Sequence, residues 1–274
     1  MTIVVFGARG RVGRQVLGGL LAAGEQVRAA TRRESPDFEA VTADLERPDT
    51  LVPALTGING VFLYAVPAGI DGFVTAARAA GVRRVVLLSS ASVVRPGARD
   101  TPISRRHRVV EEALESSGME WTFLRSGMFA TNTIGLWSRS VRRESTVRLA
   151  FPSAHSAPVH EADLAALAVA ALTTGDHSAK AYTVYGPESL TLRDQVGAIA
   201  AATGRPIAVE EVTEEAARAQ MSRSMPEAVV AATLRTWAAS DGKPVETSTV
   251  VADVLGRPAR TFAEWATDHA DDFR

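Results

Sequence analysis

The opening stretch of the chain, TIVVFGARGRVGRQVLGGLLAAG (residues 2–24), decides the fold. Residues 3–6 form a short, continuous apolar run, which is typical of a strand buried on both faces of a parallel sheet. Glycines then recur at a spacing of three, at Gly7, Gly10 and Gly13. A helix is predicted over residues 11–23, closed by Gly24. The chain therefore begins with a strand, a glycine-rich turn and a helix.

The same alternation continues beyond this stretch. Further strands are predicted over residues 26–31, 38–42, 60–66, 85–89 and 120–125. Helices are predicted over residues 50–56 and 71–80, and another opens at the Thr101-Pro102 pair, which suits a cap followed by a first-turn proline. Strands that alternate with helices indicate crossover connections. The expected fold class is therefore α/β, a Rossmann-type doubly wound parallel sheet.

The regular alternation fades toward the C-terminus. We expect a first domain over residues 1–150 and a smaller, mostly helical lobe over residues 151–274. The two interleave, because residues 181–185 read as a strand that returns to the sheet. Two hydroxyl and carboxylate pairs have the spacing of a capping box and mark helix starts in this lobe, namely Thr191 with Asp194 and Thr261 with Glu264.

Composition excludes several classes of protein. With 46% hydrophobic and 22% charged residues among 274, the chain is typical of a globular domain rather than of disorder. The net charge of −1 predicts no nucleic-acid partner, and the absence of Cys excludes thiol chemistry. The apolar run near residues 164–172 is too short to span a membrane, so a cytoplasmic location is expected. The spacing of His155, His160, Glu161 and Asp163 matches no zinc pattern, so no metal is expected.

The glycine-rich turn predicts a phosphate site. A strand that turns into a helix offers backbone amides and the positive end of a helix dipole to a pyrophosphate. Glycine permits the tight turn and the close approach of the phosphates, and Gly13 permits close packing of helix and sheet. Its place after the first strand, ahead of further crossover units, indicates a dinucleotide-binding domain.

The second strand bears on which dinucleotide binds. It ends in Thr31-Arg32-Arg33, where an NAD site usually offers an acidic residue to the ribose. Arginine there favours the 2′-phosphate of NADP(H) over NAD(H), and Arg9 is expected to join the same pocket. The alternatives are a solvated basic surface, or Glu34 as the ribose ligand. Asp44-Leu45, after the third strand, is placed to contact the adenine edge, although Asp44 suits a turn cap equally well.

Taken together, the motifs resemble the atypical short-chain dehydrogenase/reductases, in particular the NmrA-like group that includes NAD(P)H:quinone oxidoreductase-like enzymes. The likeness covers nearly the whole chain and rests on the glycine loop, Thr31-Arg32, Asp44-Leu45, Leu87-Leu88-Ser89-Ser90, His107-x-x-x-Glu111, residues 118–132, Glu161-Ala-Asp163, residues 182–191 and Thr203-Gly204-Arg-Pro206.

The resemblance implies a set of cofactor-binding residues. Those expected along the diphosphate and adenosine are Gly7, Arg9, Gly10, Arg11, Val12, Gly13, Thr31, Arg32, Arg33, Asp44, Leu45, Ala65, Val66 and Pro67. Those expected near the nicotinamide are Ser89, Ser90, Arg125, Ser126 and Gly127. Because ligands bind outside the carboxyl ends of parallel strands, these positions agree with the predicted sheet.

The chain departs from the parent family at the proton-transfer pair. Aligned by Glu111, the family's Tyr-x-x-x-Lys pair becomes Ile103 and His107. No realignment restores it, because the only tyrosines are Tyr64, Tyr182 and Tyr185, and none lies four residues before a lysine. Any chemistry must therefore proceed without the phenol as general acid.

Hydride transfer to a quinone tolerates this loss, because solvent can protonate the reduced oxygens. We therefore predict an NADPH-dependent oxidoreductase that acts on a quinone-like or other conjugated carbonyl compound. His107 is the candidate catalytic residue, and its alternative is a solvated histidine whose pKa is depressed by Arg105, Arg106 and Arg108. The residues expected to bind a flat, apolar substrate are Met128, Phe129, Asn132 and Trp137, although core packing explains the apolar ones equally well.

Two other functions remain open at this point. One is a non-catalytic NADP(H)-binding, redox-sensing regulator, in which cofactor occupancy alters the surface seen by a protein partner. The other is a redox-neutral isomerase or cyclase that keeps the cofactor as a scaffold.

Overall fold

A computed structural model of the 274-residue chain describes residues 1–33, 40–95 and 101–274. The described residues form two compact units. Unit 1 comprises Met1–Gly127, Glu161–Val184 and Val250–Pro258, and unit 2 comprises Met128–His160, Tyr185–Thr249 and Ala259–Arg274. Unit 1 includes α6 (Glu161–Thr173) and α10 (Val250–Leu255), which pack on each other.

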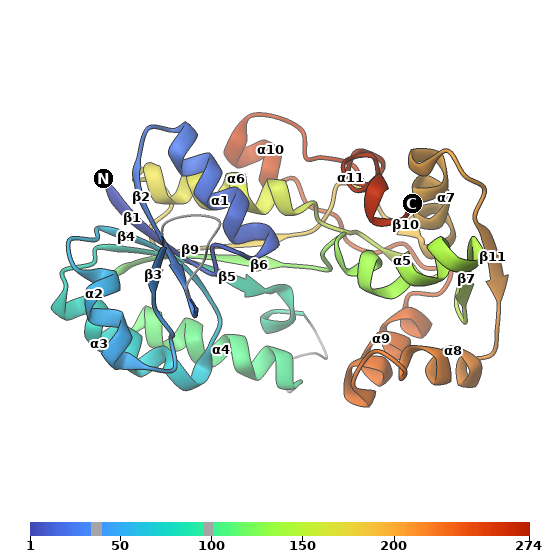
Figure 1. The fold of residues 1–274 in the computed structure, drawn as a ribbon, viewed down its shortest axis with the longest axis horizontal. Helices are drawn as coiled ribbons and strands as arrows, with labels where there is room; N and C mark the ends of the chain where they lie inside the picture. The colour runs from blue at the N-terminus through green and yellow to red at the C-terminus, as the bar shows by residue number, and fades with distance from the viewer. Residues whose placement is uncertain (34–39, 96–100) are drawn as a thin grey trace. The chain divides into compact units, whose positions relative to one another are not determined.

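A seven-stranded parallel sheet organises unit 1 (Figure 1). Its strands, in spatial order, are β3 (Ala40–Thr42), β2 (Gln26–Thr31), β1 (Thr2–Phe6), β4 (Gly60–Tyr64), β5 (Arg84–Ser90), β6 (Glu120–Ser126) and β9 (Lys180–Val184). The doubly wound α/β prediction is confirmed. The returning strand predicted over 181–185 is β9, which pairs in parallel with β6 from Thr122↔Lys180 to Ser126↔Val184. Of the strand predicted over 38–42, residues 38 and 39 lie outside the described residues.

Helices cover both faces of this sheet. They are α1 (Arg11–Ala22), α2 (Leu51–Leu55), α3 (Ile70–Ala79), α4 (Pro102–Glu115), α6 and α10, with 3₁₀ turns η1 (Pro48–Thr50), η2 (Pro67–Gly69) and η3 (Ala91–Val93). Figure 1 shows α1 and α6 on one face and α2, α3 and α4 on the other. The central strands are buried on both faces, as the continuous apolar run of β1 predicted.

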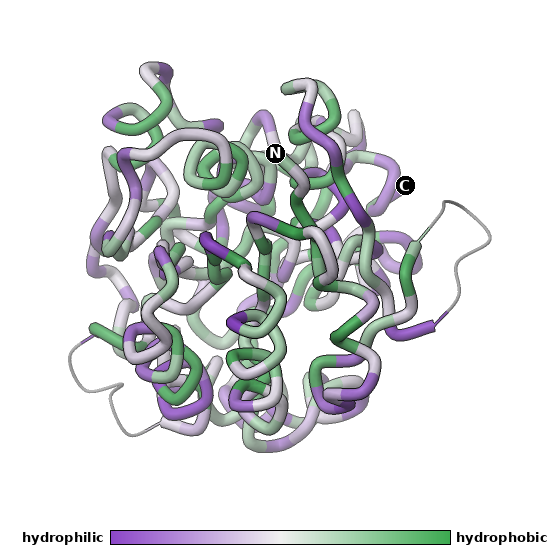
Figure 2. The backbone as a smooth tube through the Cα atoms, turned by 90° about the vertical axis from the view of Figure 1, so that its left-hand side faces the viewer, coloured by the Kyte–Doolittle hydropathy of each residue, from purple (hydrophilic) through white to green (hydrophobic). Residues whose placement is uncertain are grey.

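Local sequence explains the limits of the helices. Thr101 caps α4 by accepting a hydrogen bond from the Ser104 amide, and Pro102 occupies its first turn, as predicted. Along α4, hydrophobic and polar residues recur at helical spacing, and Figure 2 shows green and purple segments alternating along the helical coils. This amphipathic pattern is the reason that one face of α4 packs on the sheet.

Unit 2 is built mainly from helices around its own core. They are α5 (Asn132–Glu144), α7 (Leu192–Thr203), α8 (Glu214–Met221), α9 (Glu227–Ala239), α11 (Phe262–Asp268) and the 3₁₀ turn η4 (Ala270–Asp272). Two short ladders join β7 (Thr146–Leu149) to β11 (Ala208–Glu211) and β8 (His155–Ser156) to β10 (Leu190–Thr191). Both predicted capping boxes, at Thr191 with Asp194 and at Thr261 with Glu264, are present.

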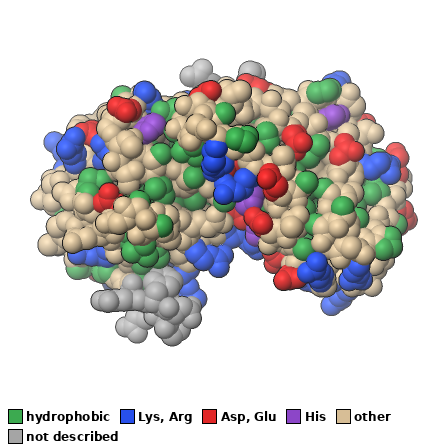
Figure 3. Space-filling view, turned by 90° about the horizontal axis from the view of Figure 1, so that it is seen from above, with side chains coloured by type: hydrophobic (Ala, Val, Ile, Leu, Met, Phe, Trp, Pro, Cys, Tyr) green, Lys and Arg blue, Asp and Glu red, His purple; other side chains and the backbone are tan. Residues whose placement is uncertain are grey.

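Two surface properties bear on function. No helix of the described residues has the length and apolar character needed to cross a bilayer. Acidic and basic side chains are interspersed on the face drawn in Figure 3, as expected from a net charge of −1.

Candidate functional site

The glycine loop of unit 1 is shaped by close backbone contacts. Gly7 has φ +68°, in the left-handed region that favours glycine, and the Gly10 amide donates to the Gly7 carbonyl at 2.8 Å. A Cβ built on Gly13 would lie 2.2 Å from the Gly7 carbonyl oxygen, closer than any real contact. The loop and the helix start therefore require glycine at these positions.

The start of α1 suits an anion. Gly10 is its N-cap, no side chain caps it, and no acidic residue lies in its first turn. The amides of a helix start and the helix dipole favour negative charge, and nothing on the helix itself supplies it. The residues present therefore fit the diphosphate of a dinucleotide, with Arg9 and Arg11 exposed beside the loop and Val12 and Gly13 buried in the first turn.

The end of β2 presents two arginines. The buried Thr31 hydroxyl donates to the Arg33 carbonyl at 2.6 Å, which fixes the turn that follows the strand. Arg32 and Arg33 are exposed, and neither forms an ion pair with any described residue. A guanidinium in this situation is available to a phosphate. Glu34, the alternative ribose ligand, lies outside the described residues.

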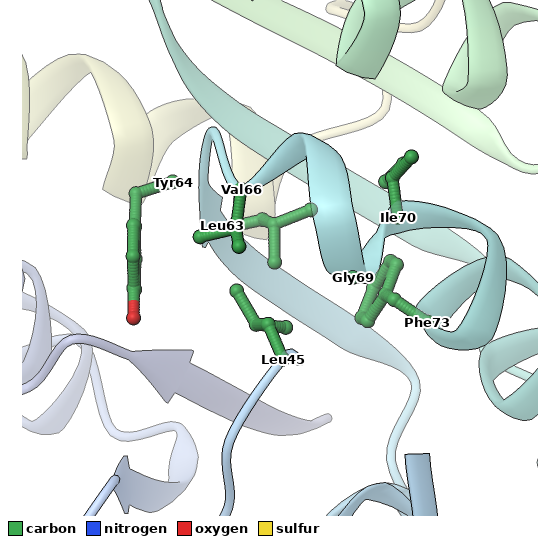
Figure 4. Close-up of a pocket in the computed structure, with 7 residues that line it drawn as sticks. All are labelled: Leu45, Leu63, Tyr64, Val66, Gly69, Ile70 and Phe73. Atoms are coloured by element: carbon green, nitrogen blue, oxygen red, sulfur yellow. The ribbon is translucent and has the colours of Figure 1, made fainter. Parts of the chain in front are cut away.

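A small, closely packed pocket with no room for a water molecule lies beside the ends of β3 and β4 (Figure 4). It is lined by Leu45, Leu63, Tyr64, Val66, Gly69, Ile70 and Phe73. A Cβ at Gly69 would lie 2.0 Å from the Leu45 carbonyl oxygen, so glycine is needed for the two backbones to meet there. Asp44, predicted at the adenine edge, also acts as the turn cap considered above, because its Oδ1 accepts from the Glu46 amide at 3.1 Å.

The end of β4 is held by an arginine from α4. Arg106 donates from Nε and Nη2 to the Ala65 carbonyl oxygen, at 3.1 and 3.0 Å. Ala65 is buried, and Val66 and Pro67 lead directly into η2. The three residues predicted to follow the cofactor therefore lie together at the carboxyl edge of the sheet, with their backbone fixed from outside.

The ends of β5 and β6 carry a buried ionic cluster that sequence reasoning did not identify. Glu111 of α4 is 2% exposed. Its Oε1 accepts from Ser89 Oγ at 2.5 Å and from Arg125 Nε at 3.0 Å, and its Oε2 accepts from Arg125 Nη2 at 2.7 Å. In the sequence, Glu111 was used only to align the family's Tyr-x-x-x-Lys pair with this chain, and no role was predicted for its carboxylate. A carboxylate on the buried face of α4, with a strand-end arginine further along the chain, was the available signal.

The remaining residues predicted near the nicotinamide lie next to this cluster. Ser90 N-caps η3, its Oγ accepting from the Ser92 amide at 3.3 Å and lying 3.0 Å from the Ser92 Oγ. Ser126 is buried at the end of β6, and the Gly127 amide donates to the Val184 carbonyl at 2.8 Å. The structure thus brings the predicted nicotinamide-side residues to adjacent strand ends.

His107 lies on the buried face of α4, one turn before Glu111. Its Nδ1 is buried and has no hydrogen-bond partner among the described residues. Burial lowers the pKa of the His107 imidazole, and Arg106 lowers it further, whereas Glu111 opposes the shift. The largest cause is therefore burial and not the flanking arginines that the sequence suggested. The ring is neutral near neutral pH, so it suits a hydrogen-bonding role better than that of a charged acid.

The four residues predicted to bind substrate belong to unit 2. Met128 and Phe129 lie beside Val159, with the Val159 amide donating to the Met128 carbonyl at 2.8 Å. Asn132 is exposed at the first position of α5. Trp137 is 3% exposed and belongs to the core of unit 2. The Trp137 side chain therefore packs in the core, which was the alternative given from the sequence.

The histidine and acidic residues near position 160 serve other contacts. Asp163 lies in the first turn of α6 and pairs with Arg257 at 2.8 Å. His160 Nε2 lies 3.3 Å from Asp268 Oδ2. Within residues 1–33, 40–95 and 101–274, no group of three or more His, Asp or Glu is positioned to hold a metal ion.

Comparison with known proteins agrees with this geometry. A family model described as NAD(P)H-binding matches residues 7–175. The chain is 37% identical, over 281 residues, to a (4-alkanoyl-5-oxo-2,5-dihydrofuran-3-yl)methyl phosphate reductase of Streptomyces griseus, with 99% of each chain covered. It is 32% identical to an NAD(P)H azoreductase of Xenophilus azovorans, again with 99% of each covered.

A solved structure shares the fold. The triphenylmethane reductase of Citrobacter sp., solved in complex with NADP(H), superimposes with a TM-score of 0.80 at 21% identity, covering 98% of this chain and all of the other. At this identity the likeness concerns the fold alone.

Proposed function

Because this chain belongs to the NAD(P)H-binding family, we propose that it is a reductase that uses NADPH to reduce a conjugated, carbonyl-activated or quinone-like acceptor. The observation that carries the proposal is the glycine loop, where a Cβ at Gly13 would meet the Gly7 carbonyl and no side chain caps α1. Such a helix start is prepared for a dinucleotide diphosphate.

The preference for NADPH over NADH rests on Arg32 and Arg33. Both follow β2 and are exposed, and no described residue pairs with them. The ribose 2′-phosphate distinguishes the two coenzymes, and a guanidinium binds phosphate through parallel, charge-assisted hydrogen bonds. NADH offers these arginines only a neutral hydroxyl.

The substrate class follows from what the site lacks and from the relatives. The name of the Streptomyces relative describes a ring alkene flanked by two carbonyl groups, and the azoreductase takes its name from an N=N acceptor. Both are conjugated acceptors that take up two electrons, at a C=C or an N=N bond, without a carbonyl group having to become an alcohol. A chain without any Tyr-x-x-x-Lys pair suits such acceptors, because the negative charge is delocalised and solvent can supply the proton.

The bound coenzyme supplies a hydride, and one proton from water completes a two-electron reduction. In the account we propose, the glycine loop and Arg32 hold the coenzyme, and Arg106 fixes the strand end at Ala65. His107, neutral and with a buried Nδ1 that has no partner among the described residues, would donate a ring N–H hydrogen bond as the acceptor gains negative charge.

The test measures oxidation of NADPH with a panel of quinones, azo compounds and 4-alkanoyl-5-oxo-2,5-dihydrofurans, the ring system in the name of the Streptomyces relative. We expect oxidation of NADPH well above the background without protein for at least one class. Arg32→Glu should weaken NADPH binding by roughly a hundredfold while NADH binding changes little, on the scale of charge-assisted hydrogen bonds. Arg78→Glu, on α3, is a control of equal charge change. Equal loss for both coenzymes would refute the 2′-phosphate assignment.

A coenzyme-sensing regulator is the second candidate, and the missing Tyr-x-x-x-Lys pair favours it. It predicts tight binding with no turnover of any acceptor and a marked difference in affinity between NADPH and NADP⁺. Turnover of any acceptor in the panel would exclude this candidate.

A further inference from the structure

Tyr64, at the end of β4, stands directly beside the glycine loop. A Cβ built on Gly7 would lie 3.1 Å from Cε1 and 3.2 Å from Cδ1 of the Tyr64 ring. The register of β1 and β4, which reaches Val5↔Phe62, places these two residues opposite each other when continued by two positions. The ring therefore fills the space that a side chain at position 7 would take.

The same row of the sheet continues to β2. The pairing of β1 with β2 reaches Phe6↔Ala30, so its next position sets Gly7 opposite Thr31. Side chains in one row point to the same face, and Gly7 has none. The Tyr64 ring thus stands over the end of β1, in the row that contains Thr31, the residue before Arg32. In Figure 4 the ring lies at one side of the pocket, apart from the other labelled residues.

The surroundings of the Tyr64 hydroxyl suit a phosphate partner. Burial raises the pKa of the phenol, and Arg32, which opposes this shift, is the charged group that acts on it most strongly. The carboxylates of Asp44 and Glu46 raise the pKa further, and Arg106 lowers it. The phenol therefore stays protonated near neutral pH and remains a hydrogen-bond donor. Within the described parts of the chain, this hydroxyl has no hydrogen-bond partner. A half-buried donor on which an exposed, unpaired guanidinium acts electrostatically is a combination that a phosphate satisfies.

We propose that Tyr64 is a specificity-determining residue that donates its hydroxyl hydrogen to the ribose 2′-phosphate recognised by Arg32, while its ring packs against Gly7. The proposal rests on the proposed function, because it requires that the glycine loop hold a dinucleotide. It adds a residue of β4 to a recognition site that the sequence assigned to the end of β2. Tyr64 contributes geometry and one neutral donor, and Arg32 contributes charge.

The experiment measures coenzyme binding by calorimetry, without any acceptor. Tyr64→Phe removes only the hydroxyl and is expected to weaken NADP⁺ about tenfold or more, while NAD⁺ changes less than about twofold. Adenosine 2′,5′-bisphosphate and 5′-AMP repeat the comparison with the adenosine half alone. Tyr182→Phe is the matched control, since Tyr182 lies on β9 and its hydroxyl is 2.8 Å from His177 Nδ1; it should leave both coenzyme affinities unchanged. Thermal melting confirms that each variant folds.

A double variant tests the shared partner. If Tyr64 and Arg32 bind one phosphate, the loss in Tyr64→Phe/Arg32→Gln is smaller than the product of the two single losses. Unchanged or tighter NADP⁺ binding by Tyr64→Phe, or equal weakening of both coenzymes, overturns the proposal while leaving the proposed function intact. Failure of the unmodified protein to bind either coenzyme overturns the proposed function itself.

Discussion

The two ends of the carboxyl edge of the unit 1 sheet differ in what they offer a ligand. At the β1 and β2 end, no side chain caps the glycine loop's helix, and Arg32 and Arg33 form no ion pair with any described residue. At the β5 and β6 end, the charges are already satisfied within the protein, since Glu111 accepts three hydrogen bonds from Ser89 and Arg125. The β1 and β2 end therefore suits an anion, whereas the ion pair at the β5 and β6 end stabilises the local structure.

This difference suggests that one end of the sheet edge serves to bind the coenzyme and the other lies near the reacting groups. In the proposed function, the coenzyme half that carries phosphates would meet uncapped backbone amides and cations. The reactive half would meet a rigid, internally neutralised cluster and an uncharged His107. Such a site would hold the reactants in position rather than transfer protons to them. This agrees with the proposed acceptors, which solvent can protonate.

The largest effect is expected where the rigid end is broken. Glu111→Gln leaves the Arg125 guanidinium, 17% exposed, without its anion, and removing one partner of a buried ion pair costs about 3 kcal/mol of stability. The exposed neighbour Glu112 provides the control, and Glu112→Gln should change stability by less than about 0.5 kcal/mol. Chemical denaturation measures both. A loss for Glu111→Gln no larger than for the control would show that the cluster does not hold this end together.

A smaller effect on stability, but a larger one on binding, is expected at the glycine loop. Gly13→Ala would force its Cβ against the Gly7 carbonyl, and overpacking of this kind costs roughly 1–3 kcal/mol. The displaced loop should weaken NADP⁺ binding by at least about tenfold.

Gly18→Ala is the matched control in the same helix, because a Cβ at Gly18 would have nothing within 4 Å. It should stabilise the protein by up to about 1 kcal/mol through helix propensity and leave NADP⁺ affinity unchanged. Equal binding by the two alanine variants would contradict the role given to the loop.

The smallest effect concerns pH. Burial and Arg106 hold the pKa of His107 below its usual 6.5, so the unfolded chain binds more protons than the folded one below that pH. The free energy of unfolding should therefore fall as pH drops through this window, by at most about 1.4 kcal/mol per pH unit for one proton. His107→Gln should make this slope shallower.

The slope of unfolding free energy against pH for His177→Gln provides a comparison for His107→Gln. The pKa of His177 is also lowered, mainly by burial and then by Lys180. Unfolding curves measured at a series of pH values give the slopes. An unchanged slope for His107→Gln would mean that His107 is not held neutral in the folded protein.

Parts of the fold that have local sequence signals were predictable, and parts that depend on packing between distant segments were not. The strand, glycine loop and helix of residues 2–24 were predictable because apolar runs, glycine spacing and caps are local signals. The return of β9 was predictable for the same reason. The recruitment of α10 to unit 1 was not, because it depends on packing against α6, which has no local signature.

The site shows the same division. The exposed arginines after β2 were predictable from their place at a strand end. The cluster of Ser89, Glu111 and Arg125 was not, because it joins three elements through side-chain geometry. The contact of Tyr64 with Gly7 was missed too, since it depends on the register between β1 and β4.

The central claim is that the opening loop binds the diphosphate of a nicotinamide dinucleotide. Titration calorimetry of the unmodified protein with NADP⁺ and, separately, NAD⁺ tests it most directly, with thermal melting in parallel. The account predicts saturable binding of one NADP⁺ per chain, a higher melting temperature with bound ligand, and weaker binding of NAD⁺. Neither heat nor a shift in melting temperature with either coenzyme would contradict it.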